Sequence, residues 1–157
     1  MEAKVTWKGR MSFEGAAESG FSVPLGADSS VGGDNDGLTP MELIAIGLAG
    51  CTAMDVISIL NKKHMEVTNF QVRAHLDNAD EHPRVFTHAT LNYVVSGHAV
   101  EESALVRAIE LSATRYCPAQ AMLSKAFPIA LEYEIYEEHE NGERHLVKQG
   151  KYLPGSQ

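Results

Sequence analysis

The chain has 157 residues, of which 44% are hydrophobic and 22% are charged. These values exclude a disordered or collagen-like chain, and the length predicts one domain over residues 1–157. The net charge of −8 disfavours binding to nucleic acid and to anionic membrane surfaces, because both repel an acidic protein.

The first part of the chain has a strand pattern followed by a loop composition. Residues 3–24 alternate apolar and polar side chains in short runs that glycines interrupt, which predicts short strands joined by turns. Residues 25–38 hold four glycines and four Asp or Asn residues, which predicts a mobile loop.

A long apolar helix is predicted over residues 39–63. Thr39 suits the N-cap, Pro40 suits the first helical position, and Glu42 stands where a capping-box acid would. Residues 43–60 are almost entirely apolar, and an apolar stretch of this length could span a membrane. Asp55 and the capping box argue against a span and favour the buried central helix of a soluble domain.

Two glycines in this helix point to a close neighbour. Gly47 and Gly50 lower helix propensity, and the packing of another backbone very close to the helix explains them best. One chain of this length has little structure with which to cover an apolar helix on every side. The pattern therefore predicts an intertwined dimer.

The remaining segments alternate between strand and helix patterns. In chain order they are strands 67–76 and 84–95, helices 101–115 and 119–127, strands 129–138 and 144–148, and a polar tail over 150–157. The strand over 84–95 has one apolar face, and the helix over 101–115 has one stripe that faces the core; the face is Leu91, Tyr93 and Val95, and the stripe is Leu105, Ala108, Ile109 and Ser112. Turn chemistry joins the first two strands, and Asn141-Gly142 joins the last two, so both pairs are predicted hairpins. The whole order predicts an α+β fold with antiparallel pairing.

The chain contains two cysteines, Cys51 and Cys117. They are too few for a disulfide framework, and the N-terminal residues lack the pattern of a signal peptide, so a reducing, cytoplasmic location is expected. The residues around Cys51 are small and leave space at its sulfur. Cys117 precedes Pro118, where a predicted helix starts, and as an N-cap it would have a lowered pKa. Inert buried filler remains an alternative for both thiols.

Other chemistries lack their motifs. The seven histidines are scattered without an HExxH pattern, which disfavours a metal site, and neither a GxSxG elbow nor a phosphate-binding glycine loop occurs. A thiol peroxidase would need a cation beside its thiolate. Arg10, in the turn of the N-terminal hairpin, is the best candidate for that cation.

Four short stretches together resemble the OsmC/Ohr family. They are Leu-Thr-Pro-Met-Glu-Leu at 38–43, Leu-Ala-Gly-Cys-Thr-Ala-Met-Asp-Val at 48–56, Glu-Leu-Ser at 110–112 and Arg-Tyr-Cys-Pro at 115–118. The resemblance covers roughly residues 4–136 and is nearest to the OsmC-like branch of redox proteins. It implies an intertwined homodimer with curved antiparallel sheets around two central helices. It also implies thiol-dependent reduction of organic hydroperoxides, and less efficiently of hydrogen peroxide, without a cofactor.

The resemblance also assigns roles to residues. Cys51 matches the peroxidatic cysteine and Cys117 the resolving cysteine, which would form a disulfide with it. Arg10 matches the family's active-site arginine, which lies across the dimer interface from the thiol. The peroxidases carry a glutamate directly after the helix proline, where this chain has Met41, so Glu42 becomes the candidate acid. A purely capping role for Glu42 remains open, with Asp55, another acid or no acid at all in the pocket.

The predicted reaction has partners and rivals. A dithiol reductant, lipoyl or thioredoxin-like, would restore both thiols, and apolar helix residues such as Ile46 and Met54 would favour an organic hydroperoxide. The main alternative is a module on the same fold that binds a small ligand or senses redox state without catalysis. A thioesterase-like hydrolase has only Cys51 in its favour.

Overall fold

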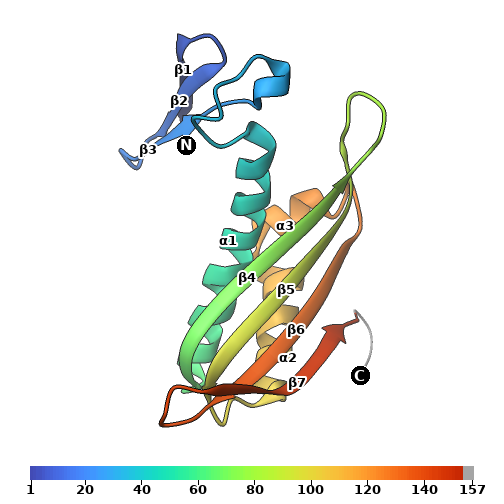
Figure 1. Cartoon of the computed structure of the whole chain (residues 1–157). Coiled ribbons are helices and arrows are strands. Elements are labelled where there is room, and N and C mark those ends of the chain that lie inside the picture. Colours follow the sequence, from blue (N-terminus) through green and yellow to red (C-terminus); the bar gives the residue numbers. More distant parts are fainter. Residues whose placement is uncertain (154–157) are drawn as a thin grey trace. The chain divides into compact units, whose positions relative to one another are not determined.

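The computed structural model describes residues 1–153, which divide into two compact units, residues 1–44 and the residues from Ala45 onward (Figure 1). The N-terminal unit has a three-stranded antiparallel sheet in the order β1 (Ala3–Gly9), β2 (Ser12–Ala17), β3 (Ser22–Leu25). These strands confirm the alternation predicted over residues 3–24. A single domain over residues 1–157 stays a prediction.

The segment after β3 is a loop, as predicted, and it is closed by its own backbone. It contains one turn of 3₁₀-helix, η1 (Ser29–Val31), whose N-cap Asp28 accepts a hydrogen bond from the N–H of Ser30 at 2.8 Å. At its ends, the N–H of Gly26 donates to the carbonyl of Leu38 at 3.0 Å. A Cβ at Gly33 would stand 1.8 Å from the carbonyl oxygen of Ala27, so glycine is required there. The mobility of this loop stays a prediction.

Helix α1 (Pro40–Lys62) confirms the predicted long helix, but the chain covers only one of its faces. The buried stripe repeats every fourth residue and consists of Leu48, Thr52, Val56 and Leu60. Ile46 and Met54 are 53% and 75% exposed. The single chain therefore leaves much of the helix uncovered, as the sequence predicted for one chain, and the dimer that would cover it stays a prediction.

The two glycines of α1 face open space among the described residues. A Cβ added at Gly47 or Gly50 would meet no atom within 4 Å. The predicted close backbone is therefore absent from the residues that the structure describes, because one chain supplies only one layer against this helix. Length and composition would also allow α1 to cross a membrane. Its stripe instead lies in the apolar core of the C-terminal unit.

The C-terminal unit contains a four-stranded sheet in the order β4 (Glu66–Asn78), β5 (Phe86–His98), β6 (Ile129–Glu138), β7 (Arg144–Tyr152). The two predicted hairpins, β4–β5 and β6–β7, are confirmed as antiparallel pairs. The central pair, β5–β6, is parallel, which corrects the expectation of antiparallel pairing throughout. A helical crossover joins β5 to β6, and such connections return the chain in the same direction.

That crossover consists of α2 (Glu102–Leu111), the π-helical segment η2 (Ser112–Tyr116) and α3 (Pro118–Leu123). Figure 1 shows it on one side of the four-stranded sheet. The predicted stripe of the second helix is confirmed, because Leu105, Ala108, Ile109 and Ser112 are all fully buried. The helix predicted over 119–127 ends earlier, at Leu123, and tight turns with N–H groups bonded three residues back follow it.

The end of the chain differs from the predicted tail over 150–157. Residues 150–152 complete β7, because Tyr152 lies opposite Leu131 in the ladder and Lys151 forms an ion pair with Glu132 at 2.7 Å. Residues 154–157 lie outside the described part of the chain.

Candidate functional site

Cys51 lies in the middle of α1, immediately before a residue of its buried stripe. Its thiol is free and half-buried. The neighbouring Thr52 is fully buried, so Cys51 stands at the border between the packed and the exposed side of the helix. A sulfur at such a border is shielded by protein yet open to a small reactant.

Cys117 is the N-cap of α3, as the sequence predicted. Its side chain is a free thiol, and the residue is only 2% exposed. The sulfur accepts a hydrogen bond from the N–H of Gln120 at 3.3 Å, and the N–H of Cys117 donates to the carbonyl of Ser112 at 2.9 Å. The second bond spans five residues, which is the spacing of the π-helical segment.

The two thiols lie near each other within the C-terminal unit. The Cys51 side chain is close enough to the Cys117 thiol to raise the pKa of Cys117. Burial is the largest of the influences that raise the pKa of Cys117 to about 12, followed by Cys51 and the charge of Asp55. The predicted lowering of this pKa is wrong, because burial outweighs the hydrogen bond from the N–H of Gln120.

A set of four buried polar residues and one partly buried carboxylate lies between the elements that carry the thiols. The hydroxyl of Thr52 is 2.7 Å from that of Tyr93 and 2.8 Å from that of Ser112. Ser112 donates to a carboxylate oxygen of Asp55 at 3.0 Å, and the amide of Gln120 donates to the Tyr93 hydroxyl at 3.3 Å. We call these five residues the buried relay.

The sequence reasoning missed most of the buried relay. The strand pattern predicts Tyr93 only as part of an apolar face, and no pattern in the sequence singles out Gln120. A signal was present in Thr52 and Ser112, which are hydroxyl residues at positions where the helical pattern predicts core. Burial raises the pKa of Tyr93 to about 12, so its hydroxyl keeps its proton at neutral pH.

Arg10 belongs to the N-terminal unit, in the turn between β1 and β2. Its guanidinium forms an ion pair with Asp34 at 2.7 Å and donates to the carbonyl of Gly32 at 3.3 Å. The side chain is 66% exposed, so it is tethered to the loop without being enclosed. A role beside the thiols stays a prediction.

Glu42 also belongs to the N-terminal unit, and its contacts are those of a capping box. One carboxylate oxygen accepts from the N–H of Thr39 at 2.7 Å and from its hydroxyl at 3.0 Å. In return, the N–H of Glu42 donates to the Thr39 hydroxyl at 3.2 Å. The hydrogen bonds from Thr39 lower the pKa of Glu42. The capping role is confirmed, and a role in catalysis stays a prediction.

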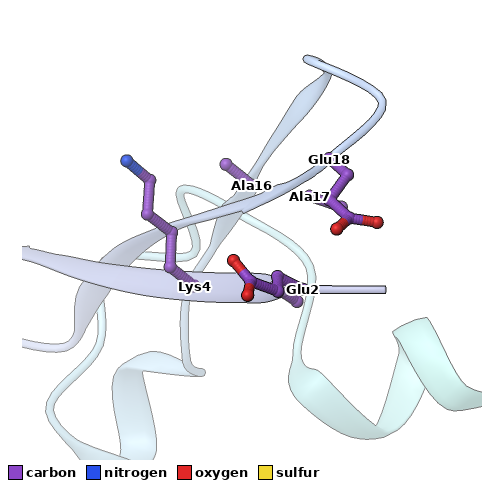
Figure 2. A pocket seen from close by; sticks show the side chains of 6 residues that line it. Glu2, Lys4, Ala16, Ala17 and Glu18 are labelled. Carbon is purple, nitrogen blue, oxygen red and sulfur yellow. The ribbon is translucent and has the colours of Figure 1, made fainter.

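The N-terminal unit also contains hollows. One is an apolar cavity of about 450 Å³, lined by Val5, Met11, Phe13, Leu25, Gly26, Ala27, Pro40 and Leu43. A smaller one of about 220 Å³ lies beside β1 and β2, and Figure 2 shows Glu2, Lys4 and Glu18 around it. The smaller hollow holds no thiol or hydroxyl nucleophile, whereas the apolar cavity suits an apolar ligand.

The fold and the thiol pair define a class: a mixed α+β protein in which a helix-borne cysteine meets a second cysteine at a helix cap. The chain belongs to the OsmC-like protein family, whose sequence model matches residues 33–132. It is 36% identical over 135 residues to Protein YhfA of Escherichia coli K12, an alignment that covers 86% of this chain and 98% of that protein.

Solved structures share this fold. A hypothetical protein from Aquifex aeolicus VF5 is 27% identical, with a TM-score of 0.77 and coverage of 88% of this chain and 97% of that one. An organic hydroperoxide resistance protein from Legionella pneumophila is 12% identical, with a TM-score of 0.62 and coverage of 85% and 94%. At 12% identity, the likeness to the Legionella protein establishes a common fold and nothing further.

Proposed function

We propose that the protein is a thiol-dependent peroxidase that reduces organic hydroperoxides, and hydrogen peroxide less efficiently. The observation that carries the proposal is the proximity of Cys51 and Cys117, which come from distant parts of the chain. The Legionella pneumophila protein that shares this fold is named an organic hydroperoxide resistance protein, which is consistent with this chemistry.

The reaction needs only sulfur chemistry. The Cys51 thiol ionises by losing its proton to solvent, and the thiolate attacks the outer oxygen of the hydroperoxide. The O–O bond breaks, and the alkoxide takes up a proton from solvent to leave as an alcohol. Cys51 is then a sulfenic acid. The Cys117 sulfur attacks the Cys51 sulfur, a disulfide forms, and the hydroxide leaves with the proton of Cys117 as water.

The surroundings of the thiols support this division of roles. Cys51 is half-buried and therefore accessible to a peroxide, whereas Cys117 is buried against its partner. The raised pKa of Cys117 keeps its proton in place, so it does not compete as the attacking thiolate. A dithiol reductant of the lipoyl or thioredoxin-like kind completes the cycle in a reducing, cytoplasmic compartment.

Arg10, with Glu42, is proposed to stabilise the Cys51 thiolate and to orient the peroxide within a homodimer. The open face of α1 supports the dimer, since Gly47 and Gly50 leave room there for a second backbone and Ile46 and Met54 are exposed apolar side chains. Sedimentation at micromolar concentration tests this assembly. A dimer that Ile46→Asp dissociates supports it, and a monomeric parent chain overturns it.

Peroxide consumption tests the activity. With cumene hydroperoxide and dithiothreitol, we expect the parent chain to consume peroxide and Cys51→Ser to consume none above background. Cys117→Ser is the matched control, because it keeps the attacking thiol and should still consume one equivalent of peroxide before the reductant acts. Mass spectrometry of the parent after one equivalent should show a disulfide between Cys51 and Cys117. Consumption that is independent of Cys51 would overturn the proposal.

A second candidate function is a non-enzymatic module that binds an apolar ligand or senses redox state. The apolar cavity of about 450 Å³ favours it. Fluorescence titration with 1-anilinonaphthalene-8-sulfonate, whose aromatic rings bind apolar cavities, tests this candidate. Saturable binding that Phe13→Ser weakens, in a chain without peroxidase activity, would establish it over the enzyme.

A further inference from the structure

The buried relay has a fixed direction, although three of its members are hydroxyl groups that can donate or accept. At one end, the amide nitrogen of Gln120 can only donate, and it donates to Tyr93. At the other end, the Asp55 carboxylate accepts from Ser112. Each hydroxyl has one proton, so Tyr93 must donate to Thr52 and Thr52 to Ser112.

The buried relay also reaches the backbone around both thiols. Thr52 follows Cys51 directly on α1. Ser112 accepts from the N–H of Cys117 through its carbonyl, and Gln120 donates to the Cys117 sulfur through its N–H. The hydrogen bonds of the relay therefore connect two segments to α1, the helix that carries Cys51. The first turn of α3 is connected through Gln120 and Tyr93, and the π-helical segment is connected through Ser112.

Burying such a set of polar groups costs free energy unless every group has a hydrogen-bond partner. Tyr93, Thr52 and Ser112 are fully buried and Gln120 is 4% exposed. A buried hydroxyl without a partner destabilises a core, whereas a chain of satisfied hydrogen bonds gives a rigid and unique arrangement. Aliphatic side chains could fill this space, but they lack the directional hydrogen bonds that fix the position of α3.

We propose that Tyr93 is a positioning residue for the formation of the disulfide, holding α3 through Gln120 so that the Cys117 sulfur stays beside Cys51. The inference rests on the proposed function. It concerns only the second step, in which Cys117 displaces hydroxide from the Cys51 sulfenic acid. The first step, the attack of Cys51 on the peroxide, does not require Cys117 to be in place.

The test compares the rates of the two steps in Tyr93→Phe and in the parent chain. One equivalent of cumene hydroperoxide is added, the reaction is quenched at intervals with dimedone, and mass spectrometry counts sulfenic acid, disulfide and sulfinic acid. We expect formation of the sulfenic acid to be unchanged and formation of the disulfide to slow about ten- to hundredfold, because small displacements of reacting atoms cost rates of this size. Sulfinic acid should accumulate. Disulfide formation at the parent's rate would overturn the proposal.

Two kinds of control separate positioning from stability. Tyr136→Phe removes another tyrosine hydroxyl, one that donates to Glu134 on the same sheet, and should change neither step. Thr52→Val should reproduce the slow second step, and Thr52→Ser should restore it, because serine keeps the hydroxyl. If Tyr93→Phe does not fold by circular dichroism, the Thr52 pair carries the same test with the same two outcomes.

A second oxidant distinguishes failure of this inference from failure of the proposed function. Diamide adds to one thiol, and the second thiol then displaces it to form the disulfide and the reduced hydrazine. This reaction needs no peroxidase activity. We expect Tyr93→Phe to slow the displacement as it slows the resolving step. If the parent chain reduces no peroxide and Tyr93→Phe still reacts with diamide more slowly than the parent, the proposed function fails and the positioning role stands. Equal rates of the two chains with diamide overturn the positioning role.

Discussion

At two helix N-termini of this molecule, an ionisable side chain accepts a hydrogen bond from a backbone N–H, and its pKa shifts in opposite directions. At α1, Glu42 accepts hydrogen bonds from Thr39 in the exposed N-terminal unit, and its pKa is lowered. At α3, the Cys117 sulfur accepts from the N–H of Gln120 inside a core, and its pKa is raised to about 12. A helix N-terminus therefore favours an anion only where burial does not impose a larger penalty.

The largest expected effect concerns the reactivity of Cys117. In a Cys51→Ser background, iodoacetamide at pH 8 should modify Cys117 much more slowly in the native protein than in urea, by up to about a thousandfold. A pKa raised from 9.0 to about 12 lowers the thiolate fraction by that factor, and only the thiolate reacts. Burial, the largest cause of the raised pKa, remains in this background, whereas the smaller contribution of Cys51 is removed. The rate of mass increase measures this ratio. Equal rates in the two states would mean that the cap, and not burial, controls this thiol.

The next effect concerns the group that stabilises the Cys51 thiolate, because Cys51 lies in the middle of α1 and not at a helix N-terminus. If Arg10 supplies that charge, Arg10→Ala should lower kcat/KM for cumene hydroperoxide about a hundredfold, the size typical of a lost transition-state donor. Asp34→Asn is the matched control, because it removes the ion-pair partner of Arg10 and keeps the cation. Unchanged kcat/KM in Arg10→Ala would remove Arg10 from the site.

The sequence predicted those features that depend on neighbouring residues. Thr39, Pro40 and Glu42 predicted the start of α1 because a capping box is local, and the stripe ending at Ser112 predicted the buried face of α2. The parallel pairing of β5 with β6 was not predictable, because it depends on how the whole crossover returns. The pKa of Cys117 and the hydrogen bonds of Tyr93 with Thr52 and Gln120 were missed for the same reason: both arise when distant segments enclose one another.

The pH dependence of stability should differ in sign between the two caps. The native state holds the Cys117 proton more tightly than the unfolded chain, so the free energy of unfolding should fall as the pH rises from about 9 toward 12. Tyr93, whose pKa is also raised to about 12, adds to this fall above about pH 10. Urea unfolding between pH 8 and 10.5 under reducing conditions measures the slope, which should be shallower in Cys117→Ala. An equal slope in that variant would contradict the effect of burial on Cys117.

The smallest expected effect belongs to the cap of α1, and it decides what Glu42 does. Thr39→Ala removes the hydroxyl that exchanges hydrogen bonds with Glu42, and it should lower the free energy of unfolding by about 1 kcal/mol in thermal or urea denaturation. Glu42→Gln keeps a capping-box side chain and should cost less. Because the pKa of Glu42 is lowered, the carboxylate's contribution is present above about pH 4.5 and is lost as the pH falls through its folded-state pKa. If Glu42→Gln leaves stability intact but lowers peroxidase activity, the carboxylate charge serves the reaction, and the cap needs only the side-chain oxygen that glutamine also has. If activity is also intact, Glu42 acts only as the capping partner of Thr39.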